Sequence, residues 1–439
     1  MTLFKIFTVI FIFWGFITGF STRVNDPGNR NETCPGCCQW PAVSDLPVIK
    51  ELPDPLVMFD GSQVTSAGQW RNDRRPELIS LFQHYMYGVP PQAPDNFSYT
   101  VDYTDRQKLG GKATLKLVTL RFGPPETSPV SLMLIVPNNR EGPAPVFIGL
   151  NFAGNHTLTD FPEVPLTKAW VNNRYTRGTD NRAHDDQRGI SASGWPFEMV
   201  IDRGYAVATI YAGEISPDYD GGFMEGVHRG YYAEGQIKPE KCEWGLISAW
   251  AWGLQRGVDY IMQDNDLDNN GIVSIGHSRL GKTAMLAGAL DERIDIIIPL
   301  QSGCGGTAPS RSEVGESVER INSSFPHWFN DIFKEFGDQV ERLPFDQHSL
   351  IALAAPRPVL LSNATEDEWA DPVGQFNMLV AATPVYELHG KEGMKTSFFP
   401  EENVLIDSRL GYFIRPGRHS MTVADWNAWL DFCDIHLGR

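Results

Sequence analysis

The hydrophobic positions of this chain follow two patterns with different periods. Between about residues 100 and 138, apolar and polar residues alternate in the segments TLKLVTLRF and VSLMLIVP, which the turn GPPETSP separates. This alternation predicts two antiparallel strands. Further along, continuous apolar runs rich in Val and Ile recur at wide spacing, at 146–152, 206–211, 272–275, 294–300 and 359–362. Such runs are typical of strands that are buried on both faces of a parallel sheet.

The stretches between these runs are long enough for helices, and a further helix is predicted at residues 76–87, where the apolar residues share one face. The chain therefore predicts an α/β fold, with a mixed, mostly parallel sheet flanked by helices in a three-layer sandwich. We expect a single domain at residues 61–439. An extended arm, rich in Pro and Asn, is expected to precede it at residues 23–60.

The first residues have the pattern of a secretory leader. Lys5 precedes an apolar run from Ile6 to Phe20, which is shorter than the roughly 20 residues that a membrane-spanning helix needs. We predict a signal peptide at residues 1–22, and a retained membrane anchor is the alternative. The mature protein is expected to be secreted or periplasmic, without stable membrane association.

Three cysteines lie soon after this leader. Cys34, Cys37 and Cys38 stand in a segment that contains Pro and Gly. They resemble half of a zinc site, but no matching Cys or His pair stands elsewhere at ligand spacing. Because export permits disulfides, tethering of the arm is the better interpretation, and the pairing stays open. We expect neither a metal nor an organic cofactor.

The charge balance excludes some classes of partner. Lys and Arg number 37 against 54 Asp and Glu, which gives a formal net charge of −17. Such a chain has no net positive field to attract phosphate, so we expect no nucleic-acid partner. A hydrophobic content of 42% is ordinary for a globular protein. Separately, we expect the protein to be a monomer. An anionic substrate would have to meet a cation supplied inside the site.

The sharpest local motif is Gly276-His277-Ser278-Arg279-Leu280-Gly281, which follows an apolar run and precedes good helix formers. A Ser at a strand-to-helix turn is the nucleophile elbow of α/β-hydrolases. The second Gly comes one position later than in the usual G-x-S-x-G, and the alternative is a Gly-rich junction with an incidental Ser. The Arg279 N–H at the helix start would hold an oxyanion.

The helix after this elbow carries Lys282, four residues beyond the predicted nucleophile and on the same helix face. A cation beside a nucleophile indicates an anionic or hydroxyl-rich substrate. The alternative is an ordinary lysine on the surface of the helix, and spacing alone does not decide between the two.

The order of a triad in this fold is Ser, then acid, then His. His419 lies in a loop before the last predicted helix, where the fold places its general base. The strand at 358–362 is followed by NATEDEWADP, in which Glu366, Asp367, Glu368 and Asp371 cluster. One of them is expected to orient His419 and to stabilise its imidazolium.

With these residues in place, the sequence resembles the glucuronoyl esterases, the fifteenth family of carbohydrate esterases. The resemblance runs from about Leu52 to the C-terminus, and the matching segments are GLNFAGNH, GHSRLGK, DERI, SGCGG, DEWADP and RHS. It implies cleavage of esters between glucuronic acid of xylan, often 4-O-methylated, and lignin alcohols. It also implies that the Arg279 side chain joins the oxyanion hole, and that Lys282, Glu316 and Trp369 contact the sugar.

One position departs from the family pattern. Many members carry a catalytic Glu in a P-x-E-S-G segment, which here reads PLQSG with Gln301. Some bacterial members instead have an Asp in D-x-W, and Asp367 fits that pattern. We predict Asp367 as the acid of this bacterial-type member, with Glu366 as the alternative. Gln301 is expected to form a hydrogen bond near His419.

These assignments predict a serine esterase that acts on glucuronoxylan or lignin–carbohydrate esters through an acyl-enzyme. A broader carbohydrate esterase, such as an acetyl xylan esterase, is an alternative within the enzymes. A non-catalytic carbohydrate-binding relative is the alternative from another class, and Gln301 is the feature that suggests it.

Overall fold

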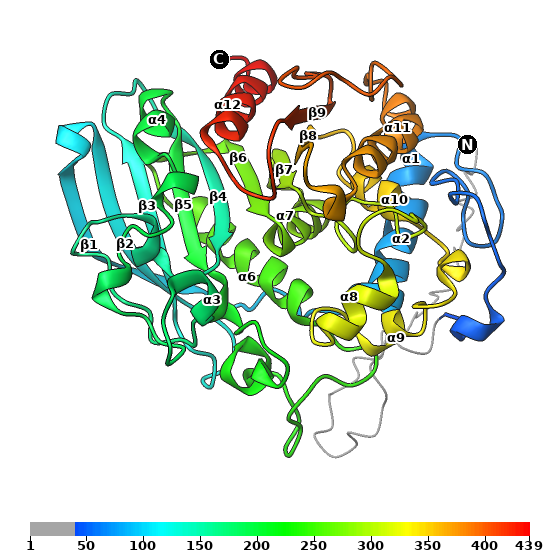
Figure 1. Cartoon of the computed structure of the whole chain (residues 1–439), viewed down its shortest axis with the longest axis horizontal. Helices are drawn as coiled ribbons and strands as arrows, with labels where there is room; N and C mark the ends of the chain where they lie inside the picture. The colour runs from blue at the N-terminus through cyan, green and yellow to red at the C-terminus, as the bar shows by residue number, and fades with distance from the viewer. Residues whose placement is uncertain (1–39) are drawn as a thin grey trace, which may run out of the picture.

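A computed structural model describes residues 40–439, so the predicted signal peptide and the cysteines at 34, 37 and 38 lie outside the described residues. Nine strands form one sheet in the order β1-β2-β3-β5-β4-β6-β7-β8-β9 (Figure 1). Their bounds are β1 Ser98–Lys108, β2 Ala113–Arg121, β3 Val130–Pro137, β4 Ala144–Asn151, β5 Ala206–Tyr211, β6 Leu267–His277, β7 Ile296–Leu300, β8 Val359–Ala364 and β9 Leu410–Arg415.

The sheet is antiparallel at one end and parallel through the rest. Strands β1, β2, β3 and β5 pair in antiparallel fashion, and β2 pairs with β3 as the alternation predicts. From β5 through β4 and β6 to β9 every pairing is parallel. The five apolar runs correspond to strands β4 to β8. The predicted fold, an α/β-hydrolase architecture with a mixed, mostly parallel sheet, is confirmed.

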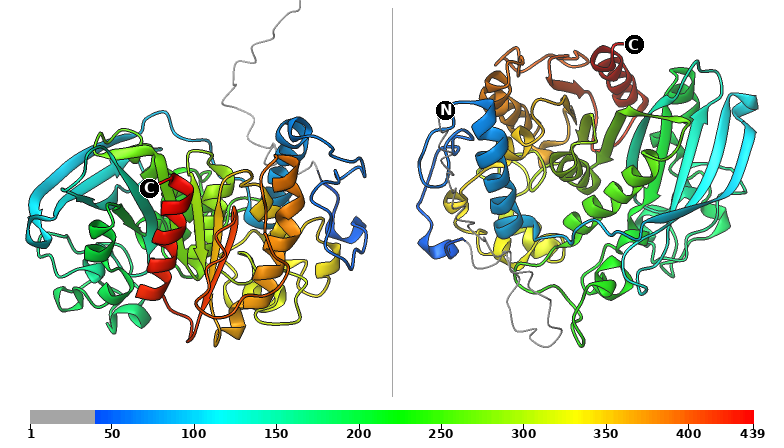
Figure 2. Two further views of the ribbon diagram at one scale, coloured as in Figure 1. Left: turned by 90° about the horizontal axis from the view of Figure 1, so that it is seen from above. Right: turned by 180° about the vertical axis from the view of Figure 1, so that it is seen from behind.

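Helices cover both faces of the sheet (Figure 2). On one face lie α6, α7, α10 and α11. Of these, α6 and α7 lie near the middle of the molecule, whereas α10 and α11 lie with α2, α8 and α9 toward the end away from β1 (Figure 1). The other face is covered by α4 and α12. The longer helices are α2 Arg75–Phe82, α4 Phe197–Asp202, α6 Leu246–Ile261, α7 Arg279–Leu290, α8 Val318–Ser324, α10 Gln347–Ala352, α11 Pro372–Leu388 and α12 Val423–Leu437. The short ones are α1 Ala67–Gln69, α3 Asn173–Thr176, α5 Ala212–Ile215 and α9 Asp331–Lys334.

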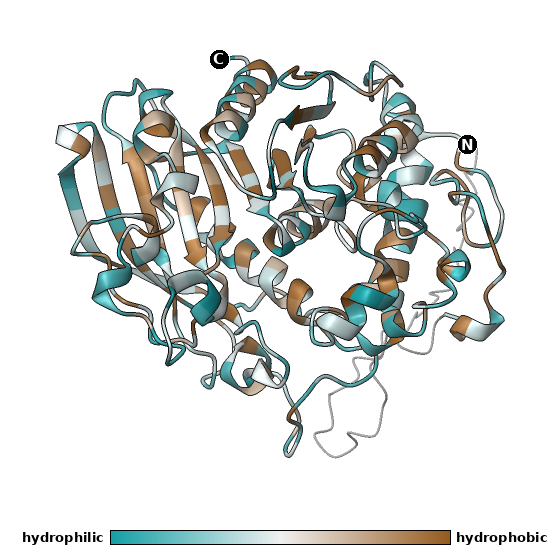
Figure 3. Cartoon of the chain, in the orientation of Figure 1, coloured by the Kyte–Doolittle hydropathy of each residue, from teal (hydrophilic) through white to brown (hydrophobic). Residues whose placement is uncertain are grey.

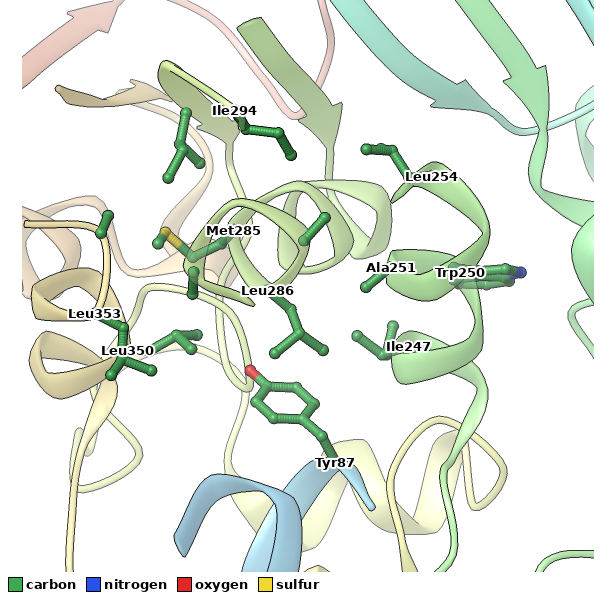
Figure 4. Packing of buried hydrophobic residues seen from close by; sticks show 14 of the residues in the cluster. Tyr87, Ile247, Trp250, Ala251, Leu254, Met285, Leu286, Ile294, Leu350 and Leu353 are labelled. Atoms are coloured by element: carbon green, nitrogen blue, oxygen red, sulfur yellow. The ribbon is translucent and has the colours of Figure 1, made fainter. Parts of the chain in front are cut away.

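The central strands are apolar throughout because both of their faces are buried, and the sheet colours mostly brown there (Figure 3). Ile296 and Ile298 pack into the core under α4 and α12, whereas Ile297 between them packs into the core on the other face. Figure 4 shows part of the latter core, where Ile247 of α6 and Leu286 of α7 lie next to Tyr87. This alternation of faces explains why continuous runs mark the parallel strands.

The predicted helix at 76–87 is present, but helical backbone begins earlier, at Ala67. The side chain of Ser66 caps this start by accepting a hydrogen bond from the Gln69 N–H. Trp40 in the described part of the arm donates from Nε1 to Ser80 Oγ of α2 at 2.9 Å. The start of the described chain thus lies against α2.

Among residues 40–439, no helix combines the length and the apolar character that a membrane crossing requires. Cys242 is disulfide-bonded, and Cys304 and Cys433 are buried free thiols. In the same part of the chain, no three His, Cys, Asp or Glu side chains gather in a group that could hold a metal ion.

Candidate active site

The predicted nucleophile occupies a strained turn between β6 and α7. Ser278 has φ 61° and ψ −127°, a conformation that non-glycine residues rarely adopt and that often marks functional sites. A Cβ on Gly276 would lie 2.0 Å from the Leu280 carbonyl oxygen, so only glycine fits there. A Cβ on Gly281 would lie 2.9 Å from the Leu300 carbonyl oxygen, where α7 packs on β7. The second glycine is thus required by helix–sheet packing, one position later than in the usual motif.

The other candidate residues follow the carboxyl ends of neighbouring parallel strands. Asp367 comes after β8 and His419 after β9, and these two strands pair in parallel. Their loops therefore meet at one edge of the sheet, where the elbow also opens. Ligands of open α/β sheets bind at this edge.

His419 and Asp367 form a direct contact. His419 Nδ1 lies 2.7 Å from Asp367 Oδ2, and the Asp367 side chain is 4% exposed against 39% for His419. The centroid of the His419 ring lies 4.4 Å from that of His277, the residue before the predicted nucleophile. Within the described residues no hydrogen bond joins the imidazole to the Ser278 hydroxyl, and such bonds often tighten only when substrate binds.

The four clustered carboxylates occupy different environments. Glu366 pairs with Arg418 at 3.3 Å, and both side chains are exposed. Asp371 is buried and caps α11 by accepting from the Gly374 N–H at 2.8 Å. Glu368 is exposed. Asp367 is the member of the four whose carboxylate meets the His419 ring.

Gln301 lies close to His419, as expected, but its contacts are with neighbours of that residue. Its Oε1 accepts from the Ser420 N–H at 2.9 Å and lies 2.9 Å from His277 Nε2. Its Nε2 is buried without a partner. Burial holds the pKa of His277 well below its usual value, so this imidazole is neutral and donates to Gln301.

The Arg279 side chain is enclosed by aromatic rings and by one carboxylate. Its guanidinium carbon lies 4.9 to 5.8 Å from the ring centroids of Phe152, Tyr175, Phe325 and Trp328. The same guanidinium forms an ion pair with Asp218. As the first residue of α7, Arg279 also presents a backbone N–H at a helix start, where amides lack intrahelical partners.

Asp218 was not identified as a site residue from the sequence. Its one local signal is its position soon after α5, the helical turn at the carboxyl end of β5. It accepts hydrogen bonds from His327 Nε2 at 3.0 Å and from Trp328 Nε1 at 2.8 Å. Burial alone would raise its pKa, but the hydrogen bond from His327 and the Arg279 charge outweigh burial and lower the pKa to about 2. Asp218 is therefore a fixed anion that holds Arg279.

The three predicted sugar contacts lie on the α7 and α11 side of the elbow. Lys282 is 4% exposed, and its Nζ donates to the Ser302 carbonyl, so the alternative of a surface lysine is wrong. Burial lowers the Lys282 pKa, and burial raises that of Glu316, with Lys282 opposing the rise. Trp369 is 52% exposed, and its carbonyl accepts from the Glu316 N–H at 3.1 Å. A cation, a carboxyl group and an open indole thus border one region.

The segment Asp264–Gly271 resembles part of a calcium-binding loop in its spacing of Asp and Asn, but its carboxylates are not arranged as a cation site. Lys116 binds Asp264 at 2.8 Å and Asp266 at 2.7 Å, and Arg140 also pairs with Asp266. These lysine and arginine contacts already neutralise the two carboxylates.

The mostly parallel sheet with helices on both faces, together with the Ser278 turn between β6 and α7, places the chain among the α/β-hydrolases. The family model described as "Glucuronyl esterase, fungi" matches residues 227–390. A relative named "Carbohydrate esterase MZ0003", from an unknown prokaryotic organism, is 46% identical over 88% of this chain and 89% of its own. The solved glucuronoyl esterase from Solibacter usitatus is 39% identical, with a TM-score of 0.83 over 90% of this chain and 99% of that one.

Fungal proteins are more distant. A "4-O-methyl-glucuronoyl methylesterase" from Phanerochaete carnosa is 28% identical over 77% of this chain and 72% of its own. Together these similarities show that the chain belongs to carbohydrate esterase family 15, the glucuronoyl esterases.

Proposed function

We propose that this chain hydrolyses the ester between glucuronic acid of glucuronoxylan, including its 4-O-methyl form, and a lignin alcohol. The observation that carries the proposal is the His419–Asp367 contact at 2.7 Å beside the strained Ser278 elbow. Family membership and the names of the relatives support the same ester class.

The proposed chemistry uses an acyl-enzyme. Ser278 Oγ attacks the C6 carbonyl while His419 Nε2 takes its proton. The buried Asp367 carboxylate accepts from Nδ1, which fixes the tautomer and stabilises the imidazolium. The alcohol leaves with the proton from His419. Water then attacks the acyl-enzyme by the same route in reverse.

We assign to Arg279 the stabilisation of the negative charge that develops on the carbonyl oxygen. Its backbone N–H stands at the start of α7, and its guanidinium is fixed by Asp218. A preorganised donor of this kind does not have to reorient during the reaction, which is the basis of its catalytic effect.

Recognition of the uronic acid is assigned to Lys282, Glu316 and Trp369. The Lys282 ammonium lies in a buried position with few competing waters, where a hydrogen bond to a sugar hydroxyl is stronger than at the surface. The exposed Trp369 ring offers a flat apolar face for a pyranose. The relatives are named as esterases of glucuronic acid, which supports a uronate over an acetyl group and catalysis over binding alone.

The predicted leader at residues 1–22 is the reason to expect export, because glucuronoxylan lies outside cells. A mature protein that starts near residue 23 in the culture medium or the periplasm would support this part of the proposal.

The test is hydrolysis of benzyl glucuronate by the wild type and by Ser278→Ala. The wild type is expected to turn over, and the variant to lose several orders of magnitude in kcat while it still binds glucuronate. Full activity in Ser278→Ala would contradict the mechanism. A wild type that binds glucuronate but hydrolyses no glucuronate ester would favour a carbohydrate-binding protein.

A further inference from the structure

A cavity of about 210 Å³ lies beside the elbow, on the face of the sheet that α4 and α12 cover. Its walls include Phe152 after β4, His277 at the end of β6, Met421 after His419, and the loop at 191–195. None of the residues assigned above to sugar recognition lines it.

The walls of this cavity contact both the candidate base and the oxyanion arginine. The His277 ring lies 4.4 Å from the ring of His419 and 6.0 Å from that of Phe152. Phe152 in turn lies 5.7 Å from the guanidinium carbon of Arg279. The cavity therefore adjoins the position where the ester bond must lie.

Lys282 belongs to the helix layer on one face of the sheet, whereas Trp195 and Ile275 of the cavity wall belong to the core on the other face. Helix α7, which carries Lys282, packs into the core with α6 and α10, and the core on the other face lies under α4 and α12. An ester whose acid half contacts Lys282 and whose carbonyl lies at Ser278 directs its alcohol half toward the cavity. The alcohol oxygen must also lie near His419, because it takes its proton there.

The lining is suited to one aromatic ring. Phe152 and Trp195 supply aromatic faces, and Met421 supplies a polarisable thioether that packs well against rings. Ser191 and Ser193 also line this region, and within the described residues neither side chain forms a hydrogen bond. They are available to bind phenol or methoxy oxygens.

We propose that this cavity binds the alcohol half of the ester and selects aryl alcohols with a single ring that bears oxygen substituents. The proposal rests on the proposed function and deepens it, because it names the part of the protein that discriminates between alcohols. Small alcohols such as methanol leave the cavity unfilled.

The experiment compares benzyl glucuronate with methyl glucuronate, which differ only in the alcohol. In Ser193→Phe the new ring fills the cavity, and the ratio of kcat/KM for the benzyl ester over the methyl ester should fall about tenfold. In Met421→Ala the packing surface is removed, and the same ratio should fall about threefold through KM. Ser193→Ala keeps the cavity open, so it should lower the ratio only when the benzyl ring carries a 4-hydroxy or methoxy group.

The ratio of kcat/KM for the two esters also distinguishes failure of the cavity proposal from failure of the proposed function. If Ser193→Phe does not fold, Met421→Ala decides alone. A ratio that stays at the wild-type value in the folded variants overturns the cavity as the alcohol site, because a general loss of activity affects both esters equally. A wild type that hydrolyses neither ester contradicts the proposed function itself and is detected before any variant is made.

Discussion

Asp218 forms an ion pair with Arg279 inside a ring of aromatic side chains. The two residues are 61 positions apart, and the loop after β5 brings the carboxylate to the start of α7. His327 and Trp328 donate to the same carboxylate, so Asp218 is held on three sides. The geometry makes Asp218 a positioning residue for Arg279, which we propose as the oxyanion residue.

The first prediction concerns Asp218→Asn. The amide keeps the shape but loses the charge, and Arg279 then has fewer constraints on its direction. We expect kcat to fall about tenfold with little change in KM, less than the 10²–10³-fold loss typical when an oxyanion donor is removed. Steady-state kinetics on benzyl glucuronate measure the changes in kcat and in KM separately. A rise in KM at unchanged kcat would place Asp218 in substrate binding instead.

The second prediction concerns stability in acid. The pKa of Asp218 is lowered to about 2 in the folded protein, below its usual value of about 4. Its ionised form therefore stabilises the fold above pH 4, and this contribution, on the order of 2 kcal/mol, is lost as the pH falls from about 4 to about 2. The difference in unfolding free energy between wild type and Asp218→Asn should narrow across that range. The exposed Asp95→Asn serves as control, and an equal narrowing there would contradict the assignment.

The third prediction tests the elbow. In Gly276→Ala the new Cβ would lie 2.0 Å from the Leu280 carbonyl oxygen, which is backbone and cannot move away cheaply. We expect a loss of more than about 3 kcal/mol in unfolding free energy, or no soluble protein. Gly142→Ala is the matched control, because a Cβ there meets nothing within 4 Å. Chemical denaturation measures both, and a wild-type midpoint for Gly276→Ala would contradict the packing argument.

The fourth prediction concerns Lys282. Lys282→Met removes the buried cation but keeps much of the side-chain volume, so the fold should persist. We expect KM for methyl glucuronate to rise at least about tenfold, the effect of losing a hydrogen bond to a charged group. Hydrolysis of p-nitrophenyl acetate, which has no sugar, should change less than about threefold. Equal losses on both esters would show that Lys282 does not act through the uronic acid.

Local sequence patterns were sufficient to predict the central strands and the elbow. Buried parallel strands give unbroken apolar runs, and the constraint on Gly276 is local. Strands β1 and β9 were not predicted; β1 is mostly exposed and therefore lacks an apolar run.

The surroundings of Arg279 could not be predicted for a different reason. Asp218 and His327 are 109 positions apart and meet only through the tertiary fold. Likewise, sequence order limited the acid to the loop after β8 but left Asp367 and Glu366 as alternatives, because adjacent residues differ only in the direction of their side chains. In the structure Asp367 points to His419 and Glu366 to Arg418.

The central claim is most directly tested by kcat on benzyl glucuronate for Asp367→Asn beside Glu366→Gln. The two variants remove one carboxylate each from neighbouring positions, one buried against His419 and one exposed. We predict that Asp367→Asn lowers kcat about 10³- to 10⁴-fold, as expected when the base loses its orienting acid, and that Glu366→Gln stays within about twofold of the wild type. Wild-type kcat in Asp367→Asn, or a larger loss in Glu366→Gln, would contradict the assignment of the acid.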